Sequence, residues 1–275
     1  MKEFEHLDDE ERLRAENDFL KMKLMLERGA VIAGLTDNPI PSAVENAFLN
    51  NIIAFEKEFD NRKKIKVFDK IGRPIHFKAA AMIPDDEIVA AWESVRDLLN
   101  EHSIDLGACS PSVTHRELYR FATEELFEFE IDDINMEGWV TDFIYDEFYP
   151  DPVFENTFLV KDDLLHDIFS QRELCSDMFY SDEFEFNGEK FTDFSNFNER
   201  IQLFKSLYED IELVRSDVES CQVDGDQCIV SGSYCAVGKN GLHEDYYAGT
   251  FRVELTCKDT DHWDFISINI EGFNP

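Results

Sequence analysis

The chain contains few glycines, few prolines and few basic side chains. Its 275 residues include 12 Gly and 8 Pro, too few for a collagenous or low-complexity chain. Only 26 Lys and Arg stand against 60 Asp and Glu, which gives a formal net charge of -34. Nonspecific nucleic-acid binding needs Lys and Arg to displace counterions from phosphates, so nucleic acid is not an expected partner.

Long apolar runs and a secretory signal are also missing. No apolar run approaches the ~18 residues that a membrane-spanning helix needs. The segment that begins Met1-Lys2-Glu3-Phe4 lacks the positive and apolar regions of a signal peptide. The sequence therefore predicts a soluble cytoplasmic protein without a membrane partner.

Cys-x-x-Cys pairs are absent, although the chain has 6 Cys. Zinc and other cofactors are therefore not expected, and free thiols are favoured over a disulfide framework in a cytosolic chain of this size. One pair is different, because Asp224-Gly225 is a hairpin turn signal. If these two residues form the loop, Cys221 lies directly opposite Cys228 and a disulfide between them is conceivable.

The chain does contain enough apolar surface for a sizeable core. Hydrophobic residues make up 43% of it, with 25 Phe, and its length suits about two domains. Apolar residues that recur every three to four positions predict helices over much of the chain. The predicted helices cover residues 8–28, 44–59, 84–99, 114–129, 158–169 and 197–211.

The apolar period changes to two residues beyond Glu212, which predicts strands. Strands are expected over 229–237, 246–257 and 263–270, and a hairpin turn at Asn187-Gly188. Pro150 and Pro152 mark the expected domain boundary. The predicted fold class is α+β: a mostly helical domain over residues 1–152, then an α+β domain with a curved antiparallel sheet over residues 153–275.

The order of the predicted helices and strands in the C-terminal part is similar to that of a known superfamily. It is carried by the helix over 197–211, the turn at Asp224-Gly225 and the closing segment from Trp263 to Phe273. Residues 155–275 resemble the nuclear-transport-factor-like, or SnoaL-like, cone superfamily. The resemblance implies a curved sheet around helices with an apolar pocket, a fold that hosts enzymes and noncatalytic modules alike. Residues 1–150 resemble the leading domain of a family of uncharacterised bacterial proteins.

Acid/base chemistry in such a pocket would need a positioned proton donor or acceptor. His243 and Asp245, at a predicted strand entrance, are candidate catalytic residues, although a polar hairpin end is the simpler interpretation. His166 and Asp167, on the predicted helix over 158–169, are a second candidate pair, with a surface pair as the simpler interpretation. The candidate ligand-binding residues are the aromatic side chains Tyr234, Tyr246 and Trp263.

Two charged segments of opposite sign occur in the first half of the chain. Residues 121–160 contain twelve acidic residues and no Lys or Arg, whereas residues 57–78 contain eight basic and three acidic residues. The acidic segment suits a solvated face, a docking site for a basic protein partner, or a Ca²⁺ or Mg²⁺ site without EF-hand spacing. Its candidate metal ligands are Asp142, Asp146 and Glu147. The basic segment suits an ordinary basic surface, and the alternative is that the two opposed segments meet within the chain or across a dimer.

Two functions are compatible with these patterns. The favoured hypothesis is a noncatalytic protein that binds a partner or a small apolar ligand through the cone and forms a homodimer through the sheet. The alternative is a small-molecule enzyme of the isomerase, hydrolase or dehydratase type, with acid/base residues in the cone pocket. An interior filled by Phe and Leu favours the first, and a buried cleft with a perturbed Asp, Glu or His favours the second.

Overall fold

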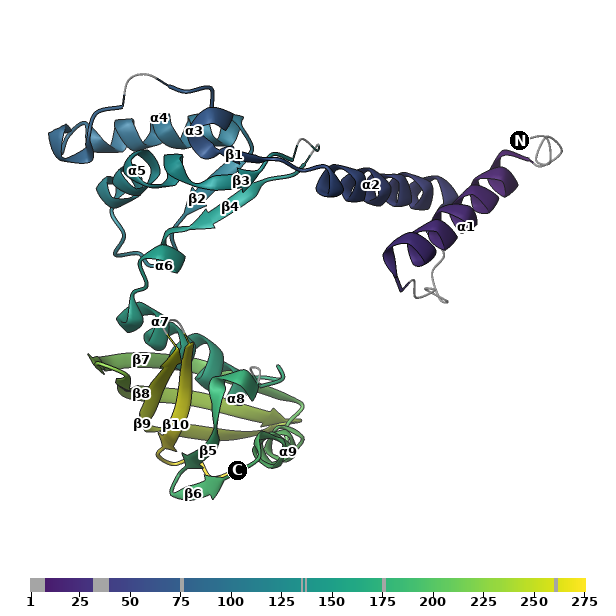
Figure 1. Ribbon diagram of the computed structural model, residues 1–275. Helices are drawn as coiled ribbons and strands as arrows, with labels where there is room; N and C mark the ends of the chain where they lie inside the picture. The colour runs from purple at the N-terminus through teal and green to yellow at the C-terminus, as the bar shows by residue number, and fades with distance from the viewer. Residues whose placement is uncertain are drawn as a thin grey trace. The chain divides into compact units, whose positions relative to one another are not determined.

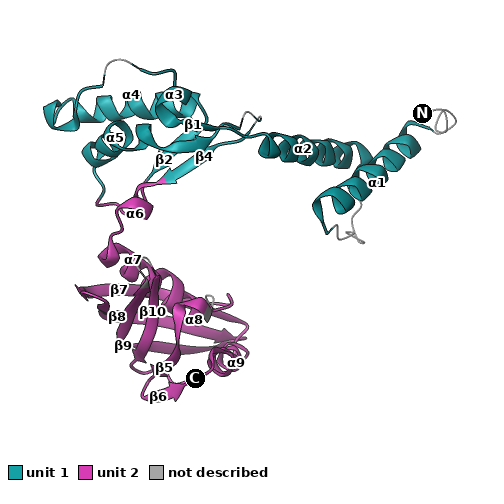
Figure 2. Ribbon diagram, in the orientation of Figure 1, with its two compact units in different colours: residues 1–107, 113–143 teal, residues 108–112, 144–275 magenta. Residues whose placement is uncertain are grey.

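The computed structural model describes residues 8–31, 40–74, 77–134, 136, 138–174, 177–259 and 262–275. The chain divides into two compact units (Figure 2). Unit 1 comprises Met1–Gly107 and Val113–Phe143, and unit 2 comprises Ala108–Ser112 and Ile144–Pro275. Pro150 and Pro152, the expected boundary, fall inside unit 2 in this division.

Unit 1 begins with helix α1 (Asp9–Arg28), which has well-defined ends. The Asp8 side chain accepts a hydrogen bond from the Glu11 N–H, and the Glu11 carboxylate accepts one from the Asp8 N–H. This capping box satisfies two N–H groups that a helix start leaves without partners. At the other end Gly29, at φ 67°, adopts the left-handed conformation that commonly ends a helix.

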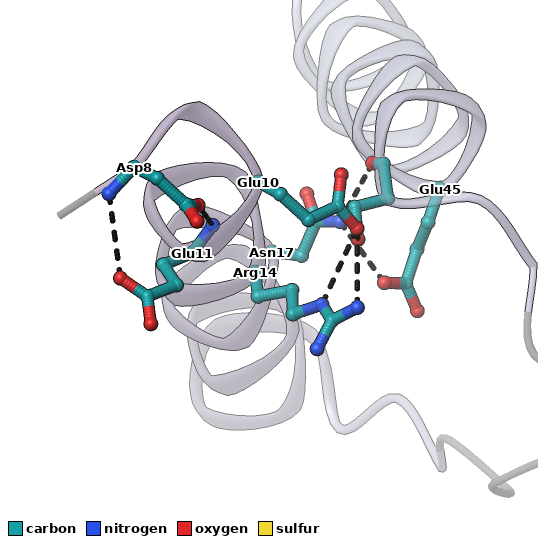
Figure 3. Close-up of polar contacts among 7 residues, drawn as sticks. Asp8, Glu10, Glu11, Arg14, Asn17 and Glu45 are labelled. Carbon is teal, nitrogen blue, oxygen red and sulfur yellow. Dashed lines mark hydrogen bonds and ion pairs between the residues drawn. The ribbon is translucent and has the colours of Figure 1, made fainter.

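Helix α2 (Ser42–Asp60) packs against α1 through a polar network (Figure 3). The side-chain amide of Asn17, which is fully buried, donates to the Ser42 carbonyl and to the Glu45 carboxylate, each at 2.9 Å. A buried amide needs such partners, so this network fixes the register of the two helices.

The remainder of unit 1 combines short helices with two small sheets (Figure 1). Strand β4 (Thr141–Ile144) pairs with β2 (Ile104–Gly107), and β1 (Lys64–Lys66) pairs with β3 (Glu130–Asp132). Strand β4 therefore pairs with a segment that lies far before it in the chain. The helices are α3 (Val67–Lys70), η1 (Ala80–Met82), α4 (Ile88–Glu101), α5 (His115–Glu124) and η2 (Leu126–Glu128).

The two oppositely charged segments meet within unit 1, as one of the sequence interpretations predicts. Strands β1 and β3 are antiparallel neighbours, which places lysines of one segment beside acids of the other. The pair of Lys66 with Glu128 is solvent-exposed on both sides and adds little stability, whereas Lys70, Asp132 and Asp133 are partly buried. The ion pairs are Lys64 with Asp132 at 3.0 Å, Lys66 with Glu128 at 2.6 Å and Lys70 with Asp133 at 3.4 Å.

Unit 2 contains a six-stranded sheet in the order β6-β5-β10-β9-β8-β7. The β10–β5 pairing is parallel and the other pairings are antiparallel. The strands from β7 to β10 are antiparallel, as predicted, and the added parallel pairing of β5 with β10 makes the sheet mixed. The strands are β5 (Tyr180–Phe186), β6 (Glu189–Phe191), β7 (Asp210–Asp224), β8 (Gln227–Asn240), β9 (His243–Asp259) and β10 (His262–Ile270).

The turn between β5 and β6 lies where the sequence predicts it. Asn187 and Gly188 both have positive φ, 48° and 82°, as a tight two-residue hairpin turn requires. The turn between β7 and β8 is displaced by one residue, since Asp224 pairs with Gln227 and the loop is Gly225-Asp226.

That displacement changes the position of the two hairpin cysteines. Cys221 lies opposite Val230 rather than opposite Cys228, so the predicted direct pairing is wrong. The two Sγ atoms are nevertheless 3.6 Å apart across the diagonal, and both cysteines are free thiols. Burial raises the pKa of the Cys228 thiol to about 12, which keeps it protonated.

Irregularities in β7 curve the sheet. The β7–β8 register shifts between Leu213 and Arg215 and again between Val218 and Ser220. Such bulges bend a strand and increase its twist. Gly232 of β8 allows the backbone of β7 to lie close to it, because a Cβ atom at position 232 would lie 2.0 Å from the Asp217 carbonyl oxygen.

Helical segments cover the inner face of this sheet (Figure 1). The helix predicted over 158–169 is present, although its middle is a π-helix. The predicted helix over 197–211 ends earlier, and Ile211 belongs to β7. The segments of unit 2 are α6 (Tyr145–Phe148), α7 (Pro152–Phe158), η3 (Leu159–Leu165), α8 (His166–Ile168), η4 (Asp177–Phe179) and α9 (Phe194–Lys205).

Candidate functional site

Aromatic side chains fill the inner side of the curved sheet at one end. Phe169, which follows α8, is fully buried. Its ring centroid lies 5.1 Å from that of Tyr234, 4.8 Å from that of Phe273 and 6.2 Å from that of Tyr247. Phe204 of α9 adds a contact with Phe273 at 4.8 Å. These rings pack against one another in the core of unit 2.

A second aromatic group fills the other end of the same core. Phe197 of α9 is fully buried and lies at its centre. The neighbouring rings come from β5 and β6, so helix and sheet interlock through them. Their centroids lie 5.7 Å (Tyr180), 5.3 Å (Phe184), 5.1 Å (Phe186) and 5.4 Å (Phe191) from that of Phe197.

A surface depression of about 520 Å³ lies elsewhere on unit 2. Its lining includes Thr250 and Arg252 of β9 and Asn269 of β10. Three buried core residues, Phe251, Ile270 and Phe273, also line it, so this depression borders the aromatic core.

A polar cluster borders the aromatic core. The Tyr208 hydroxyl donates to the Asp245 carboxylate at 3.0 Å and lies 2.5 Å from the Tyr247 hydroxyl. His243 Nε2 lies 3.0 Å from Asp245 Oδ1, with most of the histidine side chain exposed. We call these four residues the tyrosine cluster.

The position of Tyr208 depends on a glycine in β8. A Cβ atom at Gly238 would lie 2.6 Å from the Tyr208 ring, so only glycine lets the ring lie flat on the strand. Burial, followed by the neighbouring Tyr247 and Asp245, raises the pKa of Tyr208. The Tyr208 hydroxyl therefore stays protonated and acts as a hydrogen-bond donor rather than as a base.

The sequence identified half of the tyrosine cluster. His243 and Asp245 were candidates, and the structure brings them together. Tyr208 and Tyr247 were not among the candidate residues, since Tyr208 lies 37 residues before Asp245 in the chain. The alternation along β9 places Asp245 and Tyr247 on one face of the strand, and that is the signal that links this pair.

His166 and Asp167 lie on α8, apart from β9 in the sequence. The Nδ1 atom of His166 is buried without a hydrogen-bond partner among the described residues. The Asp167 main-chain carbonyl accepts a hydrogen bond from the buried ammonium of Lys205 at 2.5 Å, and the Arg172 carbonyl accepts another. Burial lowers the pKa of Lys205 to about 8. This arrangement ties the end of α8 to α9.

The three candidate ligand-binding aromatics do not share one surface. Tyr234 is buried in the aromatic core, and its hydroxyl donates to the Glu271 carbonyl at 2.8 Å. Tyr246 is 71% exposed, and its hydroxyl donates to Glu244. Trp263 is buried in the core at the start of β10. Tyr234 and Tyr246 therefore point to opposite faces of the sheet.

The candidate metal ligands differ in their burial. Asp146 is buried, and its carboxylate accepts hydrogen bonds from the Cys109 N–H at 2.6 Å and the Ser110 N–H at 3.1 Å. Asp142 and Glu147 are exposed. Across the described part of the chain, no group of three or more His, Cys, Asp or Glu side chains is arranged to hold a metal ion.

No helix in the described ranges has both the length and the apolar character needed to cross a bilayer.

Comparisons with known proteins place the likeness in the C-terminal part of the chain. No protein-family model and no curated protein matches. The Kfla4162 protein from Kribbella flavida is 12% identical, covers 44% of this chain and 91% of its own, and has a TM-score of 0.34. The Rv3472 protein of unknown function from Mycobacterium tuberculosis is 15% identical, with 47% and 76% covered and a TM-score of 0.34.

A third solved structure is a nuclear transport factor 2 (NTF2-like) superfamily protein from Salmonella enterica. It is 8% identical, covers 36% of this chain and 75% of its own, and has a TM-score of 0.28. The C-terminal part is thus similar to NTF2-like proteins, as predicted, while the fold itself is defined by the strands and helices described above. The predicted resemblance of residues 1–150 has no support from a family model.

Proposed function

We propose that the protein is a noncatalytic interaction protein, in which unit 2 is a solid cone that presents an acidic surface to a basic protein partner. The observation that carries the proposal is the filled interior. Phe169 and Phe197 are both fully buried, each surrounded by rings from helix and strand. A binding pocket for a small molecule needs a concave space of some hundreds of Å³, and these side chains occupy the inner side of the sheet.

The charge of unit 2 favours a basic partner. Acidic side chains are exposed along β7, the edge strand of the sheet. Lys239 lies 3.8 Å from both Asp210 and Glu212, so the N-terminal part of β7 is partly neutralised. Farther along, Glu219 and Asp224 are exposed, and neither is ion-paired within the described residues. Complementary charge of this kind steers association and selects the partner.

The test uses a dye-labelled lysine-rich peptide as the probe and fluorescence anisotropy as the readout. The variant Glu219→Gln/Asp224→Asn removes two charges from β7, and we expect about fivefold weaker binding at low salt. The matched control Asp182→Asn/Glu183→Gln removes the same two charges from β5, where both side chains are also exposed. Equal loss in both variants, or no binding of the peptide to the wild type, contradicts the proposal.

The tyrosine cluster supports a second candidate function, acid/base chemistry on a small molecule. Its favourable feature is the hydroxyl pair of Tyr208 and Tyr247 beside Asp245. Two tyrosine hydroxyls can act as hydrogen-bond donors to a developing oxyanion. A turnover assay requires a substrate, so the practical test is phenol, a small hydroxyl-bearing ring. Saturable binding of phenol that Tyr208→Phe abolishes would favour this function over the interaction protein.

A further inference from the structure

Helix α1 carries an exposed apolar stripe that its contact with α2 does not cover. Ala15, Phe19, Met22 and Leu26 follow one another at intervals of four, three and four residues. Phe19 is 65% exposed, Met22 59% and Leu26 81%. This spacing is the a/d repeat of a coiled coil, which places the four side chains along one seam of the helix. We call these four residues the α1 seam.

The contact between α1 and α2 is built differently from the seam. Leu24 and Leu49 are the buried apolar side chains of the two helices, and Asn17 and Ser42 are the buried polar ones. The network around Asn17 ties one end of the pair (Figure 3), and Arg28 forms ion pairs with Asp60 and Glu56 at the other. The larger apolar side chains of α1 are thus left in solvent. Since apolar burial is the main stabilising term in helix packing, the seam is suited to a partner.

We propose that α1 binds α1 of a second copy of this chain in an antiparallel coiled coil formed by the α1 seam. In that alignment Ala15 of one copy faces Leu26 of the other, and Phe19 faces Met22. The small Ala15 is opposite the long Leu26, which keeps the helices evenly spaced along the seam. Every contact occurs twice, because the arrangement has a twofold axis.

The exposed apolar area lies at the low end of what a specific dimer buries. Phe19, Met22 and Leu26 leave on the order of 350 Å² of apolar surface on each copy, or about 700 Å² for two copies, since a large aromatic side chain buries about 150 to 250 Å² when covered. Met25, adjacent to the seam and 52% exposed, increases this. With its polar rim, a two-copy contact then approaches the roughly 1,200 Å² at which specific interfaces begin.

The charge of α1 also favours a second copy. The helix holds six acidic and five basic side chains, so it is nearly neutral in a chain whose net charge is -34. Repulsion between the α1 helices of two copies is therefore small.

The charges beside the seam select the antiparallel direction. In an antiparallel pair Glu16 of each copy lies beside Lys23 of the other, which gives two attractive contacts. In a parallel pair Glu16 lies beside Glu11 of the other copy, which is a repulsive contact. Lys23 lies beside Asp18 of the other copy, which is an attractive one. The parallel pair therefore contains two repulsive contacts that the antiparallel pair avoids.

Sedimentation velocity of the full chain at increasing concentration tests the proposal. We expect a dimer for the wild type and a monomer for Leu26→Glu, with the dissociation constant weakened by at least about a hundredfold, because two charges become buried in one seam. Leu26 is exposed in the single chain, so circular dichroism should be unchanged. The matched control Leu203→Glu replaces a leucine of α9 that is 69% exposed, and it should leave the dimer intact.

A charge reversal reports the direction of the helices. Glu16→Lys places like charges together in the antiparallel pair, and we expect dimerisation about fivefold weaker. The double variant Glu16→Lys/Lys23→Glu restores opposite charges and should recover the wild-type dissociation constant. In a parallel pair the single variant would instead strengthen the dimer.

Three results would overturn the proposal. A wild type that stays monomeric up to about 100 µM, far above the range of specific complexes, removes it. A dimer that survives Leu26→Glu places the interface elsewhere, for instance on the sheet. A dimer strengthened by Glu16→Lys retains α1 as the interface but excludes the antiparallel arrangement.

Discussion

The ring of Phe169 stacks on the ring of Tyr234, with centroids 5.1 Å apart and planes inclined by 19°. Phe169 follows a helix and Tyr234 belongs to the middle of a strand, so this contact joins the two layers of unit 2. Both residues are buried. This contact shows that the interior of unit 2 is packed at this point.

Phe169→Ala should destabilise unit 2 by about 3 to 5 kcal/mol, the usual cost of removing a buried phenylalanine ring. The variant should also acquire a ligand site, because a dry apolar cavity of this kind binds benzene. Urea denaturation measures the first effect, and the benzene-induced rise in melting temperature measures the second. Phe158→Ala is the control, since Phe158 is 48% exposed. Benzene binding by the wild type would contradict a filled core.

Lys205 should make the stability of unit 2 depend on pH in an alkaline window. Its pKa is lowered from 10.5 to about 8 by burial, so the folded state binds fewer protons than the unfolded state between these values. The contribution of Lys205 to stability therefore rises as pH increases from 8 to 10.5, by up to about 3 kcal/mol at about 1.4 kcal/mol per pKa unit. Above pH 9 the raised pKa of the Cys228 thiol acts in the opposite direction, because the folded state then binds more protons than the unfolded state. Urea denaturation should therefore show the rise most clearly between pH 8 and 9, and Lys205→Met should lack it. The exposed Lys190→Met should retain the rise.

Asp146 is predicted to be a structural acceptor rather than a metal ligand. Asp146→Asn should lower the free energy of unfolding by about 2 kcal/mol, because one N–H of Cys109 or Ser110 then faces an amide N–H₂ group. Glu147→Gln, a change at an exposed neighbour, should be nearly neutral. Calorimetry with Ca²⁺ should detect no binding to the wild type or to Asp146→Asn. Millimolar or tighter Ca²⁺ binding that Asp146→Asn abolishes would reverse the assignment.

Glu45 should make the α1–α2 contact sensitive to acid. The hydrogen bond from Lys21, at 2.6 Å, and a further one from Asn17 lower the pKa of Glu45 below 4.5. Its contribution is therefore complete above pH 4.5 and is lost as pH falls through the lowered pKa. The protection factors of the α1 amides in hydrogen exchange should fall in that range for the wild type. Glu45→Gln should exchange faster at neutral pH and show less change on acidification.

In strand β10 the apolar alternation predicts the burial of some residues correctly and of one residue incorrectly. The alternation of Ile266, Ile268 and Ile270 predicts that all three share the buried face. Ile268 and Ile270 are buried, whereas Ile266 is only half-buried and Phe265 takes the inner position. The β10–β9 register shifts between Phe265 and Ser267. A bulge inserts one extra residue and reverses the phase, and its position depends on the neighbouring strand.

The sequence by itself determined the local structure of this protein: the change of apolar period near Glu212 and the Asn187-Gly188 turn. These depend on residues close together in the chain, whereas the pairing of the basic segment with the acidic one joins strands β1 and β3, which are far apart in the sequence. Only the tertiary structure decided that β4 pairs with β2, that β5 joins β10 in parallel, that Tyr208 meets Asp245 and that Phe169 fills the cone. Each of these joins distant segments, and such pairings are selected by the packing of the whole core, which no local pattern encodes.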